Sequence, residues 1–332
     1  MVRHTRREFL KRTAVAAPLA VAAPLAIRGA LAAAPLMVTT PFGAASAQDS
    51  AAAPLQMCIA RWKGTPGANP DEMKTLATKL TEQAIATLGG MGRFVKRGDV
   101  VWVKPNIAWD RTPEFAANTN PDVVATLVRL CLEAGAKTVK VGDKTCNEDK
   151  KAYPASGIEA AVKAVGGEIV YLDDSRFKEM AINGQRLDKW MVYPDIVESD
   201  LVINVPIVKT HSIPKITVCL KNYMGVVGGQ RGQWHQDLAT CLCDITRFMK
   251  PQISVVDAIR ILTGNGPTGG NIADVKWVGT IAAGTDVIAL DAFGAEVLGM
   301  KPEEIKTVAA GEKAGLGLMD YRKLALREIE VA

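Results

Sequence analysis

Short, nearly continuous apolar runs recur along the chain, and segments with helical periodicity separate many of them. Such runs are typical of strands buried on both faces, as in a parallel sheet covered by helices. Their alternation with helices predicts an α/β fold, with an open, mostly parallel sheet and helices on both faces. The expected strands are 57–60, 100–103, 138–141, 168–172, 201–205, 253–256 and 278–282, and the expected helices are 71–88, 121–134, 155–165, 236–248 and 286–298.

Sequence signals mark some element ends and leave one segment unassigned. Asn120 and Pro121 suit the cap and the first position of a helix, and Gly135 suits its end. The stretch 207–234 has no clear periodicity and is rich in glycine, lysine and polar residues. We therefore expect a long irregular insertion or active loop there.

The N-terminal segment has the features of a twin-arginine export signal. Residues 5–11 read Thr-Arg-Arg-Glu-Phe-Leu-Lys, an alanine-rich apolar stretch follows at 13–27, and Ala45-Ser46-Ala47 is a small-residue cleavage motif. The apolar stretch is too weak for a stable membrane span, which needs about 20 strongly apolar residues. We expect a signal peptide over 1–47, a single α/β domain over 48–332, translocation in the folded state by the twin-arginine translocase, and a periplasmic or otherwise exported location.

The charge balance argues against one class of partner. Residues 1–47 hold six of the 40 basic residues and one of the 35 acidic residues, so the rest of the chain carries 34 of each. The basic character of the whole chain thus belongs to the export signal. A domain without net charge gives no basis for nucleic-acid binding, and we expect no nucleic-acid partner.

Export in the folded state suits a protein that takes up a metal or cofactor before translocation, and equally one that folds or assembles early. The six cysteines include no Cys-x-x-Cys pair and no ferredoxin-like run. Cys241 and Cys243 lie two positions apart in an expected helix, so their side chains point to different faces. Joint metal ligation by this pair is therefore not expected.

Polar residues follow several of the expected strands. Lys104 and Asn106 follow one strand, Asp143 follows the next, and Asp257 follows the strand that begins at residue 253. Such residues often cap helices or close turns. Ligands of open α/β sheets, however, bind beyond the carboxyl ends of the strands. Convergence of these side chains at one sheet edge predicts a ligand site.

The two histidines beyond the leader fall in or beside the irregular segment. His211 precedes Lys221 and Asn222, and His235 follows them. Imidazole is the commonest metal ligand and the usual acid or base near neutral pH. Lysine can act as a base, a Schiff-base former or an anion anchor. We expect His211, Lys221 and His235 to share one pocket; the alternative is a polar loop whose histidines only form local hydrogen bonds.

A glycine-rich segment follows the strand that contains Asp257. It begins at Gly264 and Gly266 and reads Gly-Asn-Gly-Pro-Thr-Gly-Gly. Glycines allow the positive φ values that turn successive N–H groups toward an anion. The segment is an anion-binding loop for a carboxylate or phosphate, or a flexible hairpin or lid, and it lacks the P-loop pattern of nucleotide sites.

An ordered set of these motifs resembles an uncharacterised family, domain of unknown function 362. The matching segments are 103–106, 200–206, 209–211, 220–225, 264–267 and 284–291, with the later His235. The resemblance covers about residues 100–299 and implies an α/β fold without an established reaction. Some relatives carry ferredoxin-type iron–sulfur modules, and this chain lacks the cysteine runs of those modules.

The order and spacing of His211, Lys221 and His235 are also similar to the His…Lys…His set of nickel-dependent lactate racemases. In those enzymes the histidines surround a nickel–pincer cofactor that takes up and returns hydride at a 2-hydroxy acid. The cofactor expected here is therefore a metal ion or metallocofactor of unknown identity, with nickel and iron–sulfur as the candidates.

Together these observations predict a metal- or cofactor-dependent enzyme, an isomerase or oxidoreductase, that acts on a small carboxylate or phosphate. The predicted catalytic residues are Lys104, His211, Lys221 and His235, with His211 and His235 also as metal ligands. The predicted substrate-binding residues are Asn106, Asp143, Asn222, Asp257, Gly264 and Gly266. Two alternatives remain open: an iron–sulfur or redox protein without catalysis of its own, for which Cys219, Cys241 and Cys243 would converge with His235, and a periplasmic binding protein.

Replacing both Arg6 and Arg7 by lysine is expected to strand the precursor in the cytoplasm. The receptor reads paired guanidinium groups, and lysine does not reproduce their planar geometry. Cell fractionation measures the outcome, with Arg3→Lys as the matched control. A double variant that is still processed and exported would contradict the assignment of the signal.

Overall fold

The computed structural model describes residues 53–67 and 69–332, so the predicted export signal lies outside the described residues. Its centre is a ten-stranded sheet. In the main path of eight strands, only β11 runs antiparallel to its neighbours. The order of the path is β12 (Leu326–Val331), β1 (Met57–Trp62), β11 (Val275–Gly284), β10 (Ile253–Leu262), β7 (Leu201–Val205), β2 (Val100–Pro105), β3 (Thr138–Val141) and β4 (Glu168–Ile169).

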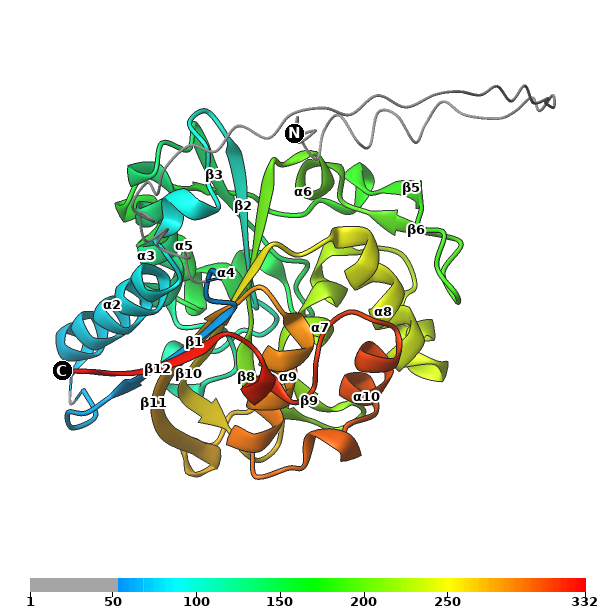
Figure 1. Ribbon diagram of the computed structural model, residues 1–332. Coiled ribbons are helices and arrows are strands. Elements are labelled where there is room, and N and C mark those ends of the chain that lie inside the picture. Colours follow the sequence, from blue (N-terminus) through cyan, green and yellow to red (C-terminus); the bar gives the residue numbers. More distant parts are fainter. Residues whose placement is uncertain (1–52, 68) are drawn as a thin grey trace, which may run out of the picture.

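Helices cover both faces of this sheet (Figure 1), which confirms the expected fold class. One face carries α2 (Pro70–Thr87), α3 (Pro121–Glu133), α4 (Asp149–Ala155) and α5 (Ile158–Ala164). The other carries α6 (Pro194–Glu198), α7 (Cys219–Asn222), α8 (Leu238–Met249), α9 (Val287–Val297) and α10 (Lys306–Lys313). Within the described part of the chain, no helix is long and apolar enough to cross a membrane.

The strands separate two hydrophobic cores. In β1, Met57 and Ile59 pack into the core under α7–α10, whereas Cys58 and Ala60 pack into the core under α2–α5. Alternate side chains of a strand point to opposite faces, so a strand with helices on both sides needs apolar residues at every position. This explains the continuous apolar runs in the sequence.

Local sequence signals set several helix ends as expected. Asn120 caps α3 by accepting a hydrogen bond from the Asp122 N–H, Pro121 occupies the first helical position, and Gly135 follows with φ of 97°. Asp286 caps α9 in the same way through the N–H groups of residues 288 and 289. Every expected strand and helix is present, although β4 is shorter than predicted and β10 and β11 are longer.

The stretch 207–234 is more ordered than predicted. It forms β8 (Ile207–His211), which pairs with the far half of β10, then β9 (Lys215–Thr217), which returns antiparallel to β8, and then α7. The expected irregular insertion is therefore largely regular structure. Its strands and α7 are too short for their periodicity to be visible in the sequence.

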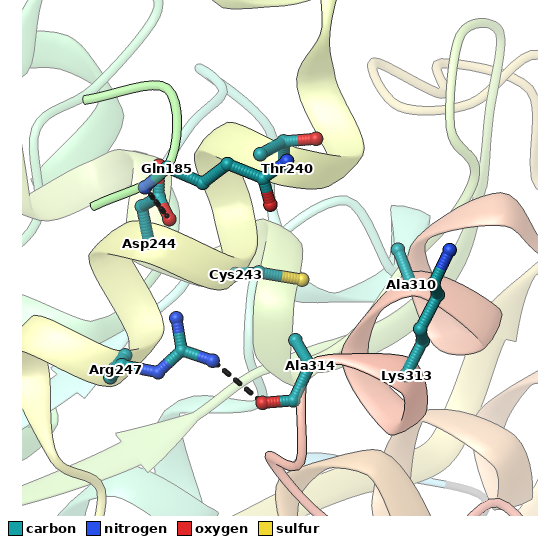
Figure 2. Close-up of a pocket in the computed structure, with 8 residues that line it drawn as sticks. All are labelled: Gln185, Thr240, Cys243, Asp244, Arg247, Ala310, Lys313 and Ala314. Carbon is teal, nitrogen blue, oxygen red and sulfur yellow. Dashed lines mark hydrogen bonds between the residues drawn. The ribbon is translucent and has the colours of Figure 1, made fainter.

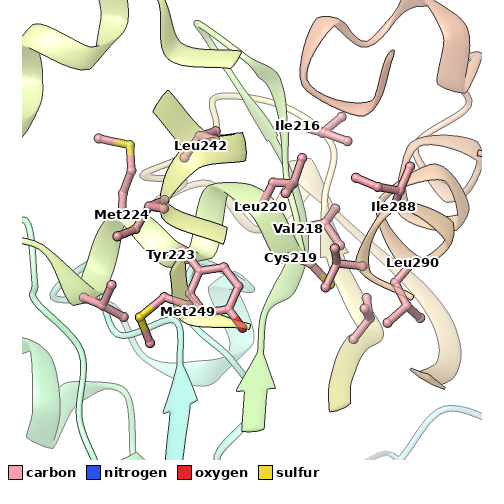
Figure 3. Packing of buried hydrophobic residues seen from close by; sticks show 14 of the residues in the cluster. Ile216, Val218, Cys219, Leu220, Tyr223, Met224, Leu242, Met249, Ile288 and Leu290 are labelled. Atoms are coloured by element: carbon pink, nitrogen blue, oxygen red, sulfur yellow. The ribbon is translucent and has the colours of Figure 1, made fainter. Parts of the chain in front are cut away.

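Contacts with α8 and α9 fix the position of helix α7. Leu220 lies among Val218, Leu242 and Ile288 in a core that joins α7 to α8 and α9 (Figure 3). The buried carboxylate of Asp291 on α9 accepts hydrogen bonds from the backbone N–H groups of Cys219 and Leu220, the first two residues of α7. Helix α9 therefore fixes the position of the residues that follow on α7, which include Lys221.

A small two-stranded sheet, β5 (Lys178–Ala181) and β6 (Lys189–Val192), packs beside α8. Its connecting loop is tied to α8 by the buried carboxylate of Asp244, which accepts the N–H groups of Gln185, Arg186 and Leu187 (Figure 2). On the same helix, Cys243 lines a cavity beside α10, whereas Cys241 belongs to the core. The two thiols therefore lie in different surroundings.

Candidate functional site

Buried polar side chains form one hydrogen-bonded network at the carboxyl ends of β2, β3 and β7. The ammonium of Lys104 is fully buried, lies 2.7 Å from Asp143 Oδ1 and donates to Asn222 Oδ1 at 3.0 Å. Asn222 Nδ2 donates in turn to Asn204 Oδ1 at 2.8 Å. The network therefore ties α7 to the ends of three neighbouring strands.

A second branch of the network extends to β8. Asn106 Nδ2 donates to Asn222 Oδ1 at 3.0 Å, and Asn106 Oδ1 accepts from Lys209 Nζ at 2.9 Å. Lys209 is 1% exposed and also donates to the Ala117 carbonyl. Two buried lysines and one buried carboxylate are thus joined through amide side chains.

Burial sets the electrostatics of these lysines. It lowers the pKa of Lys104, and the adjacent Asp143 carboxylate opposes that shift. It lowers the pKa of Lys209 to about 7, and the nearby charge of Lys221 adds to the decrease. Lys104 has a carboxylate partner, whereas Lys209 has only neutral oxygen acceptors in the described structure.

The Lys104–Asp143 pair lies directly against the backbone of Gly225. A Cβ at this position would lie 1.7 Å from Asp143 Oδ1 and 2.7 Å from Lys104 Nζ. No side chain fits there, so glycine allows the chain after α7 to close over the ion pair. Asp143 Oδ2 also accepts the N–H of Ile107 at 2.7 Å, which fixes the carboxylate from the other side.

A cavity of about 360 Å³ lies in front of this network. It is bounded by the ends of the strands, the β8–β9 turn and the loop that contains Pro267. Six of the predicted site residues line it: Asn106, Asp143, His211, Lys221, Asn222 and His235. The structure therefore brings the two histidines and Lys221 to one cavity; their roles in catalysis or metal binding stay predictions.

The two histidines of this cavity differ in the tautomer that their neutral rings adopt. Nδ1 of His211 accepts the N–H of Ile213 at 3.2 Å, so in the neutral ring the proton resides on Nε2. Nδ1 of His235 lies 2.8 Å from the Gly232 carbonyl, which can only accept, so Nδ1 carries the proton and Nε2 keeps its lone pair. His211 can donate a hydrogen bond, and His235 can accept a proton.

The charge state of His211 follows from its neighbours. Burial, and then the charges of Lys221 and Lys209, lower the pKa of His211 to about 3. The ring is therefore neutral near pH 7. With its Nδ1 lone pair engaged and its Nε2 protonated, His211 has no free lone pair for a metal in this arrangement.

Four predicted site residues lie outside the cavity lining. Lys104 lies behind the lining and supports it through Asp143 and Asn222. The Asp257 carboxylate accepts the N–H groups of Asn120 and Ile259, so it joins β10 to the start of α3. Gly264 and Gly266 pack against Asp274 and the Thr210 carbonyl, and only the following Pro267 and Thr268 reach the cavity.

Sequence reasoning missed three residues at or beside the cavity. Lys209 stands in the Lys-Thr-His motif, but its role depends on burial, which its sequence position does not reveal. Arg231 lines the cavity and donates to the carbonyls of Met224 and Thr145 at 2.8 and 2.9 Å. The exposed Cys146 also lines it, 3.7 Å from the Arg231 guanidinium.

The residues present do not form a protein-liganded metal site. Among residues 53–67 and 69–332, no group of three or more His, Cys, Asp or Glu side chains could hold a metal ion. The convergence of Cys219, Cys241 and Cys243 with His235 that an iron–sulfur site requires is likewise not found there. All six thiols are free, and burial raises the pKa of Cys241 and of Cys243 to about 11, so these two are not thiolates at neutral pH.

A family model matches the region of the chain that carries the sequence motifs. The family model for the domain of unknown function (DUF362) matches residues 101–296. A thylakoid-associated protein of Synechocystis sp. is 33% identical over 239 residues, which cover 69% of this chain and 72% of that protein. The lactate racemase apoprotein from Thermoanaerobacterium thermosaccharolyticum matches with a TM-score of 0.41 and 10% identity, over 73% of this chain and 57% of that one.

Gly225→Ala is expected to lower the free energy of unfolding by roughly 2–4 kcal/mol, because the new methyl group displaces a buried ion pair. Gly232→Ala is the matched control at the same cavity, since a Cβ at Gly232 meets no atom within 4 Å. Chemical denaturation measures both variants. Equal free energies of unfolding for the two variants would show that the ion pair does not require glycine at position 225.

Proposed function

This chain belongs to the family named domain of unknown function (DUF362), and we propose that its cavity binds a small organic anion and transfers a proton to or from it. The observation that carries the proposal is the charge of the lining. Lys221 and Arg231 line the cavity without a carboxylate partner in the described residues, whereas Asp143 is paired with Lys104 and Lys144 is paired with Asp174. A carboxylate or phosphate would supply the missing negative charge.

Lys221 is the side chain best suited to hold this anion. It lies at the cavity, on the helix that Asp291 and the Asn204–Asn222 hydrogen bond fix in place. Burial lowers the pKa of Lys221 to about 8, and Arg231 is among the charges that add to the decrease. The ammonium is therefore still protonated at neutral pH, and an anion would stabilise the protonated form.

The two histidines are suited to different roles, His235 as a base and His211 as a hydrogen-bond donor. Nε2 of His235 is the basic atom at the cavity, and the Gly232 carbonyl holds the ring in the tautomer that a general base requires. Nε2–H of neutral His211 would donate to an oxygen of the bound anion. Such a pair would suit proton transfer at a carbon beside a carboxylate, as in an isomerase of organic acids.

Metal chemistry has less support from these residues. A catalytic zinc ion usually takes three protein ligands, and no group of three His, Cys, Asp or Glu side chains among the described residues could hold a metal ion. Three proposals rest on the sequence: export by the twin-arginine translocase, a periplasmic location, and a cofactor that brings its own metal. Metal analysis of protein from the exported pool tests the proposed cofactor.

The affinity for a small carboxylate is expected to be highest below about pH 7 and to fall through a transition near pH 8, because protonated Lys221 is the binding form. Above that transition the decrease should approach about tenfold per pH unit. Calorimetric titration with acetate measures this profile. Lys221→Arg retains its charge at every pH used and should lose the transition near pH 8. Persistence of the same transition in that variant would exclude Lys221 as its origin.

His235→Gln is expected to slow proton transfer by roughly 10²–10⁴-fold, because it removes the basic atom. The assay incubates a panel of small hydroxy, keto and phosphorylated acids with protein from the exported pool in D₂O and follows deuterium incorporation by NMR. His211→Gln is the matched variant and should weaken binding more than it slows exchange. Unchanged exchange in His235→Gln would refute its role as base, and no binding of any anion would refute the proposed function.

A further inference from the structure

The charges around the cavity do not balance. Lys104 is neutralised by Asp143 at 2.7 Å, and Lys144 lies 2.7 Å from Asp174. No other carboxylate pairs with a cation of this region in the described residues. Three basic side chains therefore have no carboxylate partner in the described residues: Lys221, Arg231 and Lys209. Burial lowers the pKa of Lys209 to about 7, so the full positive charges near neutral pH are those of Lys221 and Arg231.

Different parts of the fold hold these three basic side chains near one another. Arg231 is anchored by the carbonyls of Lys144, Thr145 and Met224, none of which neutralises its charge. Lys221 is fixed by α7, and Lys209 lies on β8 behind Asn106. Besides burial, the charge of Lys221 lowers the pKa of Lys209, and the charge of Arg231 lowers the pKa of Lys221. The three groups are therefore close enough for like charges to repel one another.

A single negative charge would offset only part of this excess. One carboxylate bound at Lys221 would leave Arg231 at the cavity without a counter-charge. A ligand with two negative charges would be matched by Lys221 and Arg231, with Asn106 between the ligand and Lys209. Buried charges are tolerated when they are paired and hydrogen-bonded, so a second negative charge on the ligand would stabilise the complex by pairing with Arg231.

The size and the remaining lining restrict the carbon part of the ligand. The volume of about 360 Å³ is at the small end of the range for ligand pockets. Ala108, Trp109, Ile213, Met224 and Pro267 supply apolar lining. This combination fits a short carbon skeleton that carries the charged groups.

We propose that the ligand of this cavity is a small dianion, a dicarboxylate or a phosphate monoester, whose two charges are bound by Lys221 and Arg231. This inference rests on the proposed anion-binding function and narrows it. It distinguishes the cavity from a site for simple monocarboxylic acids, in which one cation would suffice.

The test compares ligands that differ in charge and little else. Calorimetric titration of the mature chain at about pH 7.5 would use succinate against butyrate, and ethyl phosphate against diethyl phosphate. In at least one pair, the dianion is expected to bind about tenfold or more tightly than its monoanionic partner. In Lys221→Met and in Arg231→Gln the preference should fall below about threefold. The control Lys306→Met, at an exposed position of α10 outside the cavity lining, should retain it, and thermal unfolding checks that each variant is folded.

Each outcome has a distinct meaning. A preference in the first pair only identifies a dicarboxylate, and a preference in the second pair only identifies a phosphate monoester. Equal affinities within both pairs would overturn the dianion inference and leave anion binding intact. Failure of all four compounds to bind would overturn both the inference and the proposed function. A preference that survives in both Lys221→Met and Arg231→Gln would place the dianion elsewhere.

Discussion

The buried ion pair between Lys104 and Asp143 is the constraint on which the rest of the site depends. Two charges removed from water are tolerated only with close partners and complete hydrogen bonding. Here the partners come from the ends of β2 and β3, the hydrogen bonds come from Asn222 and the Ile107 N–H, and the space exists because residue 225 is glycine. Satisfying this pair fixes α7, and α7 carries Lys221 to the cavity.

The same network separates the roles of the lysines. Lys104 is neutralised and acts as part of the framework, whereas Lys209 and Lys221 have no carboxylate partner in the described residues and burial lowers the pKa of both. Excess positive charge in a partly enclosed space favours an anion. The opposite tautomers of His211 and His235 then place one hydrogen-bond donor and one proton acceptor at the same cavity. The arrangement fits proton transfer on an anion better than it fits a metal held by protein ligands.

Much of the fold could be predicted from the sequence, because apolar runs buried on both faces and capped helices leave strong local patterns. Asn120, Pro121 and Gly135 marked one helix at both ends. The strand-end residues Lys104, Asn106 and Asp143 pointed to the correct sheet edge. The two strands and short helix in 207–222 were missed because three to five residues carry too little periodicity.

Other parts of the site could not be predicted because they depend on tertiary contacts. Asp257 was expected to follow the end of a strand, but it lies inside the longer β10, and its carboxylate accepts backbone N–H groups beside α3, outside the cavity lining. Arg231 lies in a polar stretch, and only its carbonyl partners show why it stays at the cavity. The tautomers of His211 and His235 depend on neighbouring backbone atoms, which sequence spacing does not specify.

Binding of an anion at the cavity between Lys221 and Arg231 can be observed directly by anomalous diffraction. A crystal soaked in selenate would contain a dianion whose selenium is located without bias from the protein atoms. We expect a selenium peak within hydrogen-bonding reach of both Lys221 and Arg231, and its loss in crystals of Lys221→Met. A cavity without a selenium peak in well-soaked wild-type crystals, with ordered selenate elsewhere on the protein, would contradict anion binding at this cavity.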